Sequence, residues 1–138
     1  MKRRALLLGL GVAALLACKR EERCKTCGMK IDRASVWTTE IVSPDDKTLV
    51  FDTPRCALYA MRKEGVAAKT VRVREYYDAK GPMRDAKDLR FVEGGDVVGP
   101  MGPDFVPVEP SRVSKFIQDH GADRAYTLEE ITSEVLQK

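Results

Sequence analysis

The chain has 138 residues, of which 43% are hydrophobic and 33% charged, proportions that suit one folded domain with a real core. Its formal net charge of +3 comes from the N-terminus: without Lys2, Arg3 and Arg4, the basic side chains number 21, as do the acidic ones. A nucleic-acid-binding protein normally keeps a basic patch, and no such cluster stands out in the rest of the sequence. The composition therefore argues against a nucleic-acid partner.

The N-terminus has the organisation of a bacterial export signal. A basic start at residues 2–4 precedes an uncharged run at 5–17, which is too short for a comfortable membrane span. The run ends in Leu-Leu-Ala before Cys18, a sequence that resembles a lipobox. We therefore predict a signal peptide at 1–17 and, at 18–23, a lipidated Cys18 that carries acyl chains such as palmitate, followed by a charged tether. An ordinary signal cleaved near Ala17 and a short buried helix are the alternatives.

Residues 24–138 are predicted to form a single compact α+β domain. In its first half, extended segments at 36–42 and 47–52 flank a turn signal and predict a hairpin. Thr53 and Pro54 have the residue types of an N-cap and a first helical position, and Gly65 ends the predicted helix. The alternating segment 70–77 then predicts a half-exposed strand. The first half is thus β-β-α-β.

The second half has similar punctuation. Extended segments at 89–92 and 105–108 precede a helix that Pro110 opens and Gly121 ends, the same spacing as between Pro54 and Gly65. This shared spacing predicts two similar β-β-α units, one in each half of the chain. The segment 128–136 is predicted to be a final short helix.

The stretch around Cys24 and Cys27 concentrates most of the chemistry in the sequence. Thiolate and thioether sulfur are soft ligands that select Cu(I) or zinc over calcium or magnesium. Gly28 permits a sharp turn after the second thiol, so that Cys24, Cys27 and Met29 can converge on one point. We predict a soft-metal site here.

Met101 is the expected distant partner of this site. It lies between Gly-Pro pairs in a loop with no apolar periodicity, where a long side chain is a poor core residue but a good projecting ligand. Cu(I) accepts thioether sulfur readily, whereas zinc rarely uses it. Met61, by contrast, lies on a predicted helix face and is interpreted as a core residue.

Two other functions for the cysteine pair remain open. A structural zinc site needs four ligands, for which Cys24, Cys27, Cys56 and His120 are available. A redox dithiol would place its cysteines at the start of a helix after a buried strand, and no strand precedes them here. Cys56 is also explained as a small buried apolar residue, and His120 as a helix C-cap.

Together, the lipobox, the C-x-x-C-G-M-x-I motif of Cys24 to Ile31 and the G-P-M-G motif of Gly99 to Gly102 resemble the NosL-type copper-binding lipoproteins, which assist nitrous oxide reductase assembly. The resemblance spans nearly the whole chain. It implies a single domain of two β-β-α-β-like units that acts as a periplasmic Cu(I) chaperone. In that family cysteine and methionine hold the metal, sometimes with a third nitrogen or water ligand. Carried over to this sequence, it favours Cys27 and Met101 first, then Cys24 and Met29. Pro103 stands where a metal-binding histidine is expected, which leaves the third ligand open.

The prediction is therefore a lipid-anchored Cu(I) metallochaperone on the periplasmic face of a bacterial membrane, and not an enzyme. Its expected partners are the membrane, through Cys18, and an exported copper acceptor, either nitrous oxide reductase or another copper protein. The alternatives are a periplasmic thiol-disulfide oxidoreductase that uses Cys24 and Cys27, and a zinc-binding structural lipoprotein module.

Overall fold

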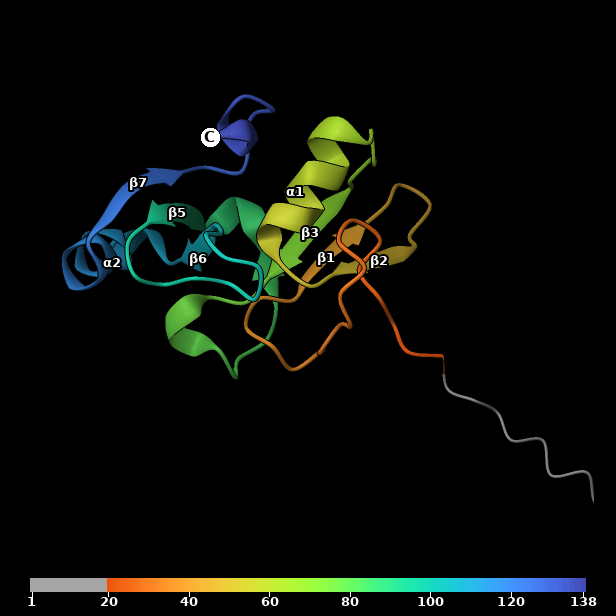
Figure 1. The fold of residues 1–138 in the computed structure, drawn as a ribbon, viewed down its shortest axis with the longest axis horizontal. Coiled ribbons are helices and arrows are strands. Elements are labelled where there is room, and N and C mark those ends of the chain that lie inside the picture. The colour runs from red at the N-terminus through yellow and green to blue at the C-terminus, as the bar shows by residue number, and fades with distance from the viewer. Residues whose placement is uncertain (1–19) are drawn as a thin grey trace, which may run out of the picture.

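The structure, a computed structural model, describes residues 20–138, so the predicted signal peptide at 1–17 and the predicted lipidation site Cys18 lie outside the described residues. Two antiparallel sheets and two α-helices form an α+β fold, which confirms the predicted fold class (Figure 1). The strands are β1 (Thr39–Val42), β2 (Thr48–Phe51), β3 (Thr70–Val73), β4 (Arg84–Asp85), β5 (Arg90–Gly94), β6 (Val106–Val108) and β7 (Ala122–Tyr126). The helices are α1 (Pro54–Lys63) and α2 (Val113–His120).

The two halves of the chain share one topology. The first sheet has the strand order β2-β1-β3-β4 and the second the order β6-β5-β7, with every neighbouring pair antiparallel. In each half the first strand lies between the second and the third, and the helix connects the second strand to the third. The two predicted β-β-α-β-like units are therefore present, with β4 as an addition to the first.

Helix α1 begins and ends where its local signals predict. Thr53 has extended backbone angles (φ −142°, ψ 160°), and its hydroxyl accepts a hydrogen bond from the backbone N–H of Cys56. Pro54 takes the first helical position, where a missing N–H costs nothing. Beyond the other end, Gly65 adopts φ +71°, which ends the helix.

Helix α2 starts later than predicted, because Pro110–Arg112 forms a 3-10 turn ahead of Val113. Its predicted end is confirmed, with Gly121 in the left-handed conformation at φ +64°. Phe116 is its fully buried residue.

Strand β5 lies between two hydrophobic cores. Phe91 packs into the larger core with Ile41, Phe51 and Leu58, whereas Val92 packs into the smaller core with Phe116. Successive side chains of a strand point to opposite faces of its sheet, so one short strand joins the two halves.

The strand predicted over 70–77 ends at Val73, which corrects its second part. Tyr76–Asp78 is a 3-10 turn, and the Tyr76 ring meets Phe116 edge to face at 5.1 Å between ring centroids. Glu75 is buried and accepts a hydrogen bond from the backbone N–H of Glu109. Contacts with the second half therefore override the local alternation.

The prediction of a final helix at 128–136 was wrong. A reciprocal capping box does form, since Glu130 accepts from the Thr127 N–H at 2.7 Å and Thr127 accepts from the Glu130 N–H at 3.3 Å. The chain then continues as turns up to a 3-10 turn at Val135–Gln137. Arg62 of α1 donates hydrogen bonds to the Leu128 and Ile131 carbonyl oxygens, so tertiary contacts set this segment's path.

Strand β7 was missed, because its sequence, Ala-Asp-Arg-Ala-Tyr, has no apolar alternation. Its three central residues are exposed, and its backbone pairing with β5 makes it a strand. Across residues 20–138, no helix combines the length and the apolar content needed to cross a membrane.

Candidate metal centre

The segment from Cys24 to Met29 folds into a closed turn. The Cys24 carbonyl oxygen accepts a hydrogen bond from the Gly28 N–H, and the Cys24 N–H donates to the Met29 carbonyl oxygen, both at 2.8 Å. Gly28 has φ +78°, a conformation that glycine adopts without a Cβ clash. The predicted turn is therefore confirmed, and it places Cys24 and Cys27 at the two ends of one tight loop.

The corner between β2 and α1 brings a second pair of side chains to the same place. Asp52 follows β2 directly, and Cys56 lies in the first turn of α1, where its N–H is held by the Thr53 cap. Asp52 and Cys56 are 6% and 8% exposed, respectively.

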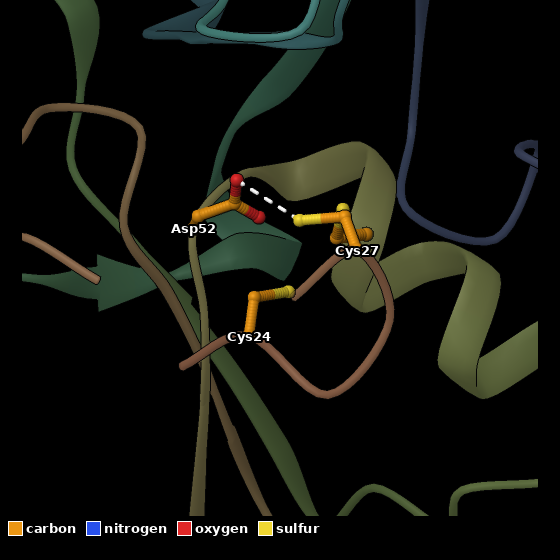
Figure 2. Close-up of side chains that lie close together, drawn as sticks. Cys24, Cys27 and Asp52 are labelled. Atoms are coloured by element: carbon orange, nitrogen blue, oxygen red, sulfur yellow. Dashed lines mark hydrogen bonds between the residues drawn. The ribbon is translucent and has the colours of Figure 1, made fainter. Parts of the chain in front are cut away.

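Two hydrogen bonds join the loop to this corner. The Thr26 hydroxyl donates to the Cys56 carbonyl oxygen at 3.2 Å, and the Cys27 thiol donates to Asp52 Oδ2 at 3.2 Å. The three Sγ atoms and one carboxylate oxygen then lie within 4.8 Å of one another. We name Cys24, Cys27, Cys56 and Asp52 the thiol cluster. In Figure 2, Cys24 and Cys27 approach Asp52 from the two ends of the loop.

Burial raises the pKa of two thiols in the cluster, those of Cys27 and Cys56, and so keeps them protonated near neutral pH. Desolvation raises the pKa of Cys27 to about 11, with the hydrogen bond to the Asp52 carboxylate acting in the same direction and the Met29 backbone N–H opposing it. Desolvation also raises the pKa of Cys56 strongly. A reactive redox cysteine has a lowered pKa, and the C-x-x-C pair lies in a turn, not at a helix N-terminus. Both observations count against the redox alternative.

One oxygen of the cluster that could bind a metal is not used by any described protein atom. Asp52 Oδ1 is buried and, within residues 20–138, has no hydrogen-bond partner, although buried carboxylate oxygens are nearly always paired. Two sulfurs held about 2.3 Å from one tetrahedral zinc ion would lie about 3.8 Å apart, so a spread of up to 4.8 Å needs little contraction. The residues fit a soft metal ion.

The two predicted methionine ligands are exposed to solvent. Met29 is 41% exposed and directly follows Gly28, and Met101 is 61% exposed. Met101 lies at the tip of a two-residue turn, in which Gly99 and Gly102 exchange backbone hydrogen bonds of 2.7 and 3.1 Å. We name Gly99–Gly102 the methionine turn. The structure thus gathers Cys24 and Cys27 in the cluster and leaves Met29 and Met101 on loops outside it; their roles as ligands remain predictions.

Asp52 and Cys56 are the members that sequence reasoning did not select. Cys56 is buried as expected of a small apolar residue, but its sulfur also belongs to the thiol cluster. The available signal was local: an aspartate just before a capped helix start, and a cysteine in that helix's first turn, lie close together.

His120 does not complete the Cys3His set that the zinc alternative would use. Its Nδ1 lies 2.8 Å from Asp96 Oδ1, and its ring packs on Phe116, 4.5 Å between centroids, in the smaller core. Among residues 20–138, the three cysteines that could hold a metal are joined by Asp52, which takes the fourth position in place of a histidine.

Comparison with known proteins gives consistent results. In fold, the chain is similar to the crystal structure of the copper chaperone NosL from Shewanella denitrificans, with a TM-score of 0.70 and 22% identity over 82% of this chain and 91% of that one. No curated protein matches the sequence significantly. The NosL family model matches residues 15–136, most of the chain. The protein therefore belongs to the NosL family.

Proposed function

We propose that this protein is a membrane-anchored Cu(I) metallochaperone that delivers copper to an exported cuproenzyme. The observation that carries the proposal is the thiol cluster, in which three sulfurs converge with the carboxylate of Asp52. Within residues 20–138, Oδ1 of that carboxylate has no hydrogen-bond partner. Thiolate sulfur is among the preferred donors of Cu(I). The copper-chaperone description of the similar Shewanella protein supports the same function.

Copper binding requires the thiols to lose their protons, because the thiolate is the metal ligand. Asp52 Oδ2 already accepts the hydrogen bond of the Cys27 thiol and is the nearest base for that proton. The positive charge of the bound metal then balances the negative charge of the thiolate that the lost proton leaves behind. Asp52 passes the proton on to solvent and is again a carboxylate, whose negative charge favours a cation in a mostly buried site.

Transfer of copper requires an accessible edge, since ligands of the acceptor must enter before those of the donor leave. Cys24 and Cys56 are buried, whereas Cys27 is partly exposed and Met29 and Met101 are exposed. We propose that Cys27 and Met101 hold copper at this edge, that Cys24 and Met29 assist, and that the acceptor approaches from the same side. Nitrous oxide reductase is the client we propose first.

The anchor is proposed to be a lipid on Cys18, with the protein on the periplasmic face of the membrane. The charged tether then holds the metal loop no more than about 20 Å from the bilayer, at about 3.3 Å per extended residue. Replacing Cys18 with serine should release the protein from the membrane fraction and abolish its labelling by palmitate. A Cys24→Ser control should stay anchored and labelled; loss of anchoring in both variants would contradict the proposal.

The decisive test is anaerobic titration of the purified reduced protein with Cu(I) in the presence of a competing chelator. We expect stoichiometric binding that Cys27→Ser weakens about tenfold or more, because one thiolate donor is lost. Met101→Ala should also weaken binding. A reduced protein that ignores Cu(I) but exchanges disulfides would overturn the proposal and favour an oxidoreductase.

Zinc is the second candidate, favoured by Asp52. A Cys3Asp set supplies four donors, the number that a structural zinc site uses, and includes a carboxylate oxygen that zinc accepts. The same titration with Zn(II) separates the two functions. A zinc module should bind Zn(II) independently of Met101, and Asp52→Asn should weaken Zn(II) more than Cu(I).

A further inference from the structure

The methionine turn belongs to a long connection whose two ends are fastened. Residues 95–105 join β5 to β6. Near the start of this connection, the Asp96 N–H donates to the His120 carbonyl oxygen at 3.0 Å. At its end, Arg55 Nε donates to the Pro103 carbonyl oxygen at 3.1 Å, two residues after Met101. Between these anchors, Met101 projects into solvent.

Asp104 makes the second anchor at that end. It is 5% exposed, and its Oδ1 accepts hydrogen bonds from the backbone N–H groups of Arg55, at 2.9 Å, and of Phe105, at 2.7 Å. The Arg55 guanidinium also lies over the Phe105 ring, 4.6 Å from its centroid. Backbone and side chain of one residue, Arg55, therefore hold residues 103–105 against the first turn of α1.

Arg55 is also a covalent neighbour of the thiol cluster. It directly precedes Cys56 and lies three residues after Asp52. Met101 lies three residues before Asp104, so their Cα atoms are at most about 11 Å apart. The attachment thus ties the methionine turn to the helix end that supplies two members of the cluster.

We propose that Arg55 is a positioning residue, which acts with Asp104 to hold the methionine turn beside the thiol cluster so that the Met101 sulfur can reach the bound metal. The proposal rests on the proposed copper function and adds the element that controls its methionine ligand. A single thioether contributes to binding according to its effective concentration at the metal, which a fastened turn raises and a loose eleven-residue connection lowers.

The test compares two conservative substitutions on the same helix. Arg55→Lys keeps a positive charge near Glu93 but removes the Nε donor to Pro103 and the planar contact with Phe105. Arg62→Lys is the matched control, because Arg62 also donates from its guanidinium to carbonyl oxygens, those of Leu128 and Ile131, away from the methionine turn. Cu(I) dissociation constants are measured anaerobically for both, for Met101→Ala, and for the Arg55→Lys/Met101→Ala double variant.

We expect Arg55→Lys to weaken Cu(I) binding about tenfold and Arg62→Lys to weaken it less than about twofold. In a protein that already carries Met101→Ala, adding Arg55→Lys should cause no further loss of affinity. An equal loss from Arg55→Lys with and without Met101 would overturn the proposal, because Arg55 would then act on the thiol cluster directly. So would unchanged affinity in Arg55→Lys. Failure of the wild-type protein to bind Cu(I) would instead refute the underlying copper function.

A second readout does not depend on affinity. The methyl group of Met101, labelled with carbon-13, reports in NMR spectra on the mobility of the turn in the metal-free protein. Arg55→Lys should sharpen this signal and move it toward that of an unstructured methionine, whereas Arg62→Lys should leave it unchanged. An unchanged signal in Arg55→Lys, with thermal unfolding confirming the fold, would also overturn the proposal.

Discussion

Cys56 combines two roles in one side chain. It is buried in the larger core and lies in the first turn of α1, as a small apolar residue would. Its sulfur nevertheless lies within 4.8 Å of the donor atoms of Cys24, Cys27 and Asp52. Burial alone therefore does not distinguish a core cysteine from a candidate ligand; the neighbouring side chains do.

Replacing Cys56 with serine tests which role dominates. Serine preserves the size of the side chain but removes a soft donor, so Cu(I) affinity should fall about tenfold or more if all three thiols bind. Anaerobic competition with a Cu(I) chelator measures the change, with Met61→Leu as the control that alters only packing. Unchanged affinity with reduced stability would make Cys56 a core residue only.

The raised thiol pKa values predict a pH dependence of copper binding. Since the pKa of Cys27 is about 11, its thiol is protonated throughout the range from about pH 6 to 8, and binding must release that proton. If binding releases one proton, the apparent Cu(I) dissociation constant should rise about tenfold for each pH unit by which the pH falls. Each further proton released should multiply this change by another factor of about ten. Competition titrations at several pH values give the slope, and a flat profile would rule out a protonated Cys27 as ligand.

At the scale of the element, the Cys24–Met29 turn depends on one backbone conformation. Gly28 has φ +78°, and a Cβ added there would meet open space among residues 20–138, so a side chain would cause backbone strain and no collision. Gly65, beyond the C-terminal end of α1, has φ +71° and the same open surroundings. The two glycines are matched in strain, but only Gly28 belongs to the turn that carries Cys24 and Cys27.

Gly28→Ala and Gly65→Ala should therefore separate folding from binding. Each should lower the free energy of unfolding by about 1–2 kcal/mol, the cost of a left-handed conformation for alanine. Only Gly28→Ala should also weaken Cu(I) binding, because it disturbs the turn that orients Cys24 and Cys27. Chemical denaturation and Cu(I) titration measure the two effects, and equal losses of affinity in both variants would contradict this separation.

At the scale of the whole molecule, the fold is held together by apolar packing on both sides of β5. Phe51, Phe91 and Phe105 are at most 1% exposed in the larger core, as is Phe116 in the smaller one. The thiol cluster joins the larger core, since Cys24 and Cys56 belong to that core and Cys27 packs against it. A metal ion bound by the cluster would therefore add to a core that the chain builds for itself.

Removal of metal should accordingly leave the protein folded. A strong chelator should preserve the far-ultraviolet circular dichroism spectrum. It should lower the free energy of unfolding only by the linkage effect of a bound ligand, about 2.7 kcal/mol when the free metal had been at a hundred times its dissociation constant. Ile131→Ala, at a fully buried position, serves as a destabilised reference and should cost about 2–5 kcal/mol. Unfolding on chelation would favour the structural zinc module.

The sequence by itself determined the features that depend on neighbouring residues. The Thr53–Pro54 start and Gly65 end of α1, the Gly121 end of α2 and the Gly28 turn were all predictable, since capping and positive φ are local requirements. The repeated β-β-α order was equally readable from its punctuation, whereas the last strand of the second unit, β7, was not.

Only the tertiary structure decided which side chains meet. Cys27 and Asp52 are joined across 25 positions, and Thr26 and Cys56 across 30, by hydrogen bonds that form once the loop packs on the start of α1. Strand β7 and the turns after Thr127 likewise follow from pairing with β5 and from the hydrogen bonds of Arg62. Local propensity carries no information about such contacts, because their energy comes from residues that are distant in the sequence.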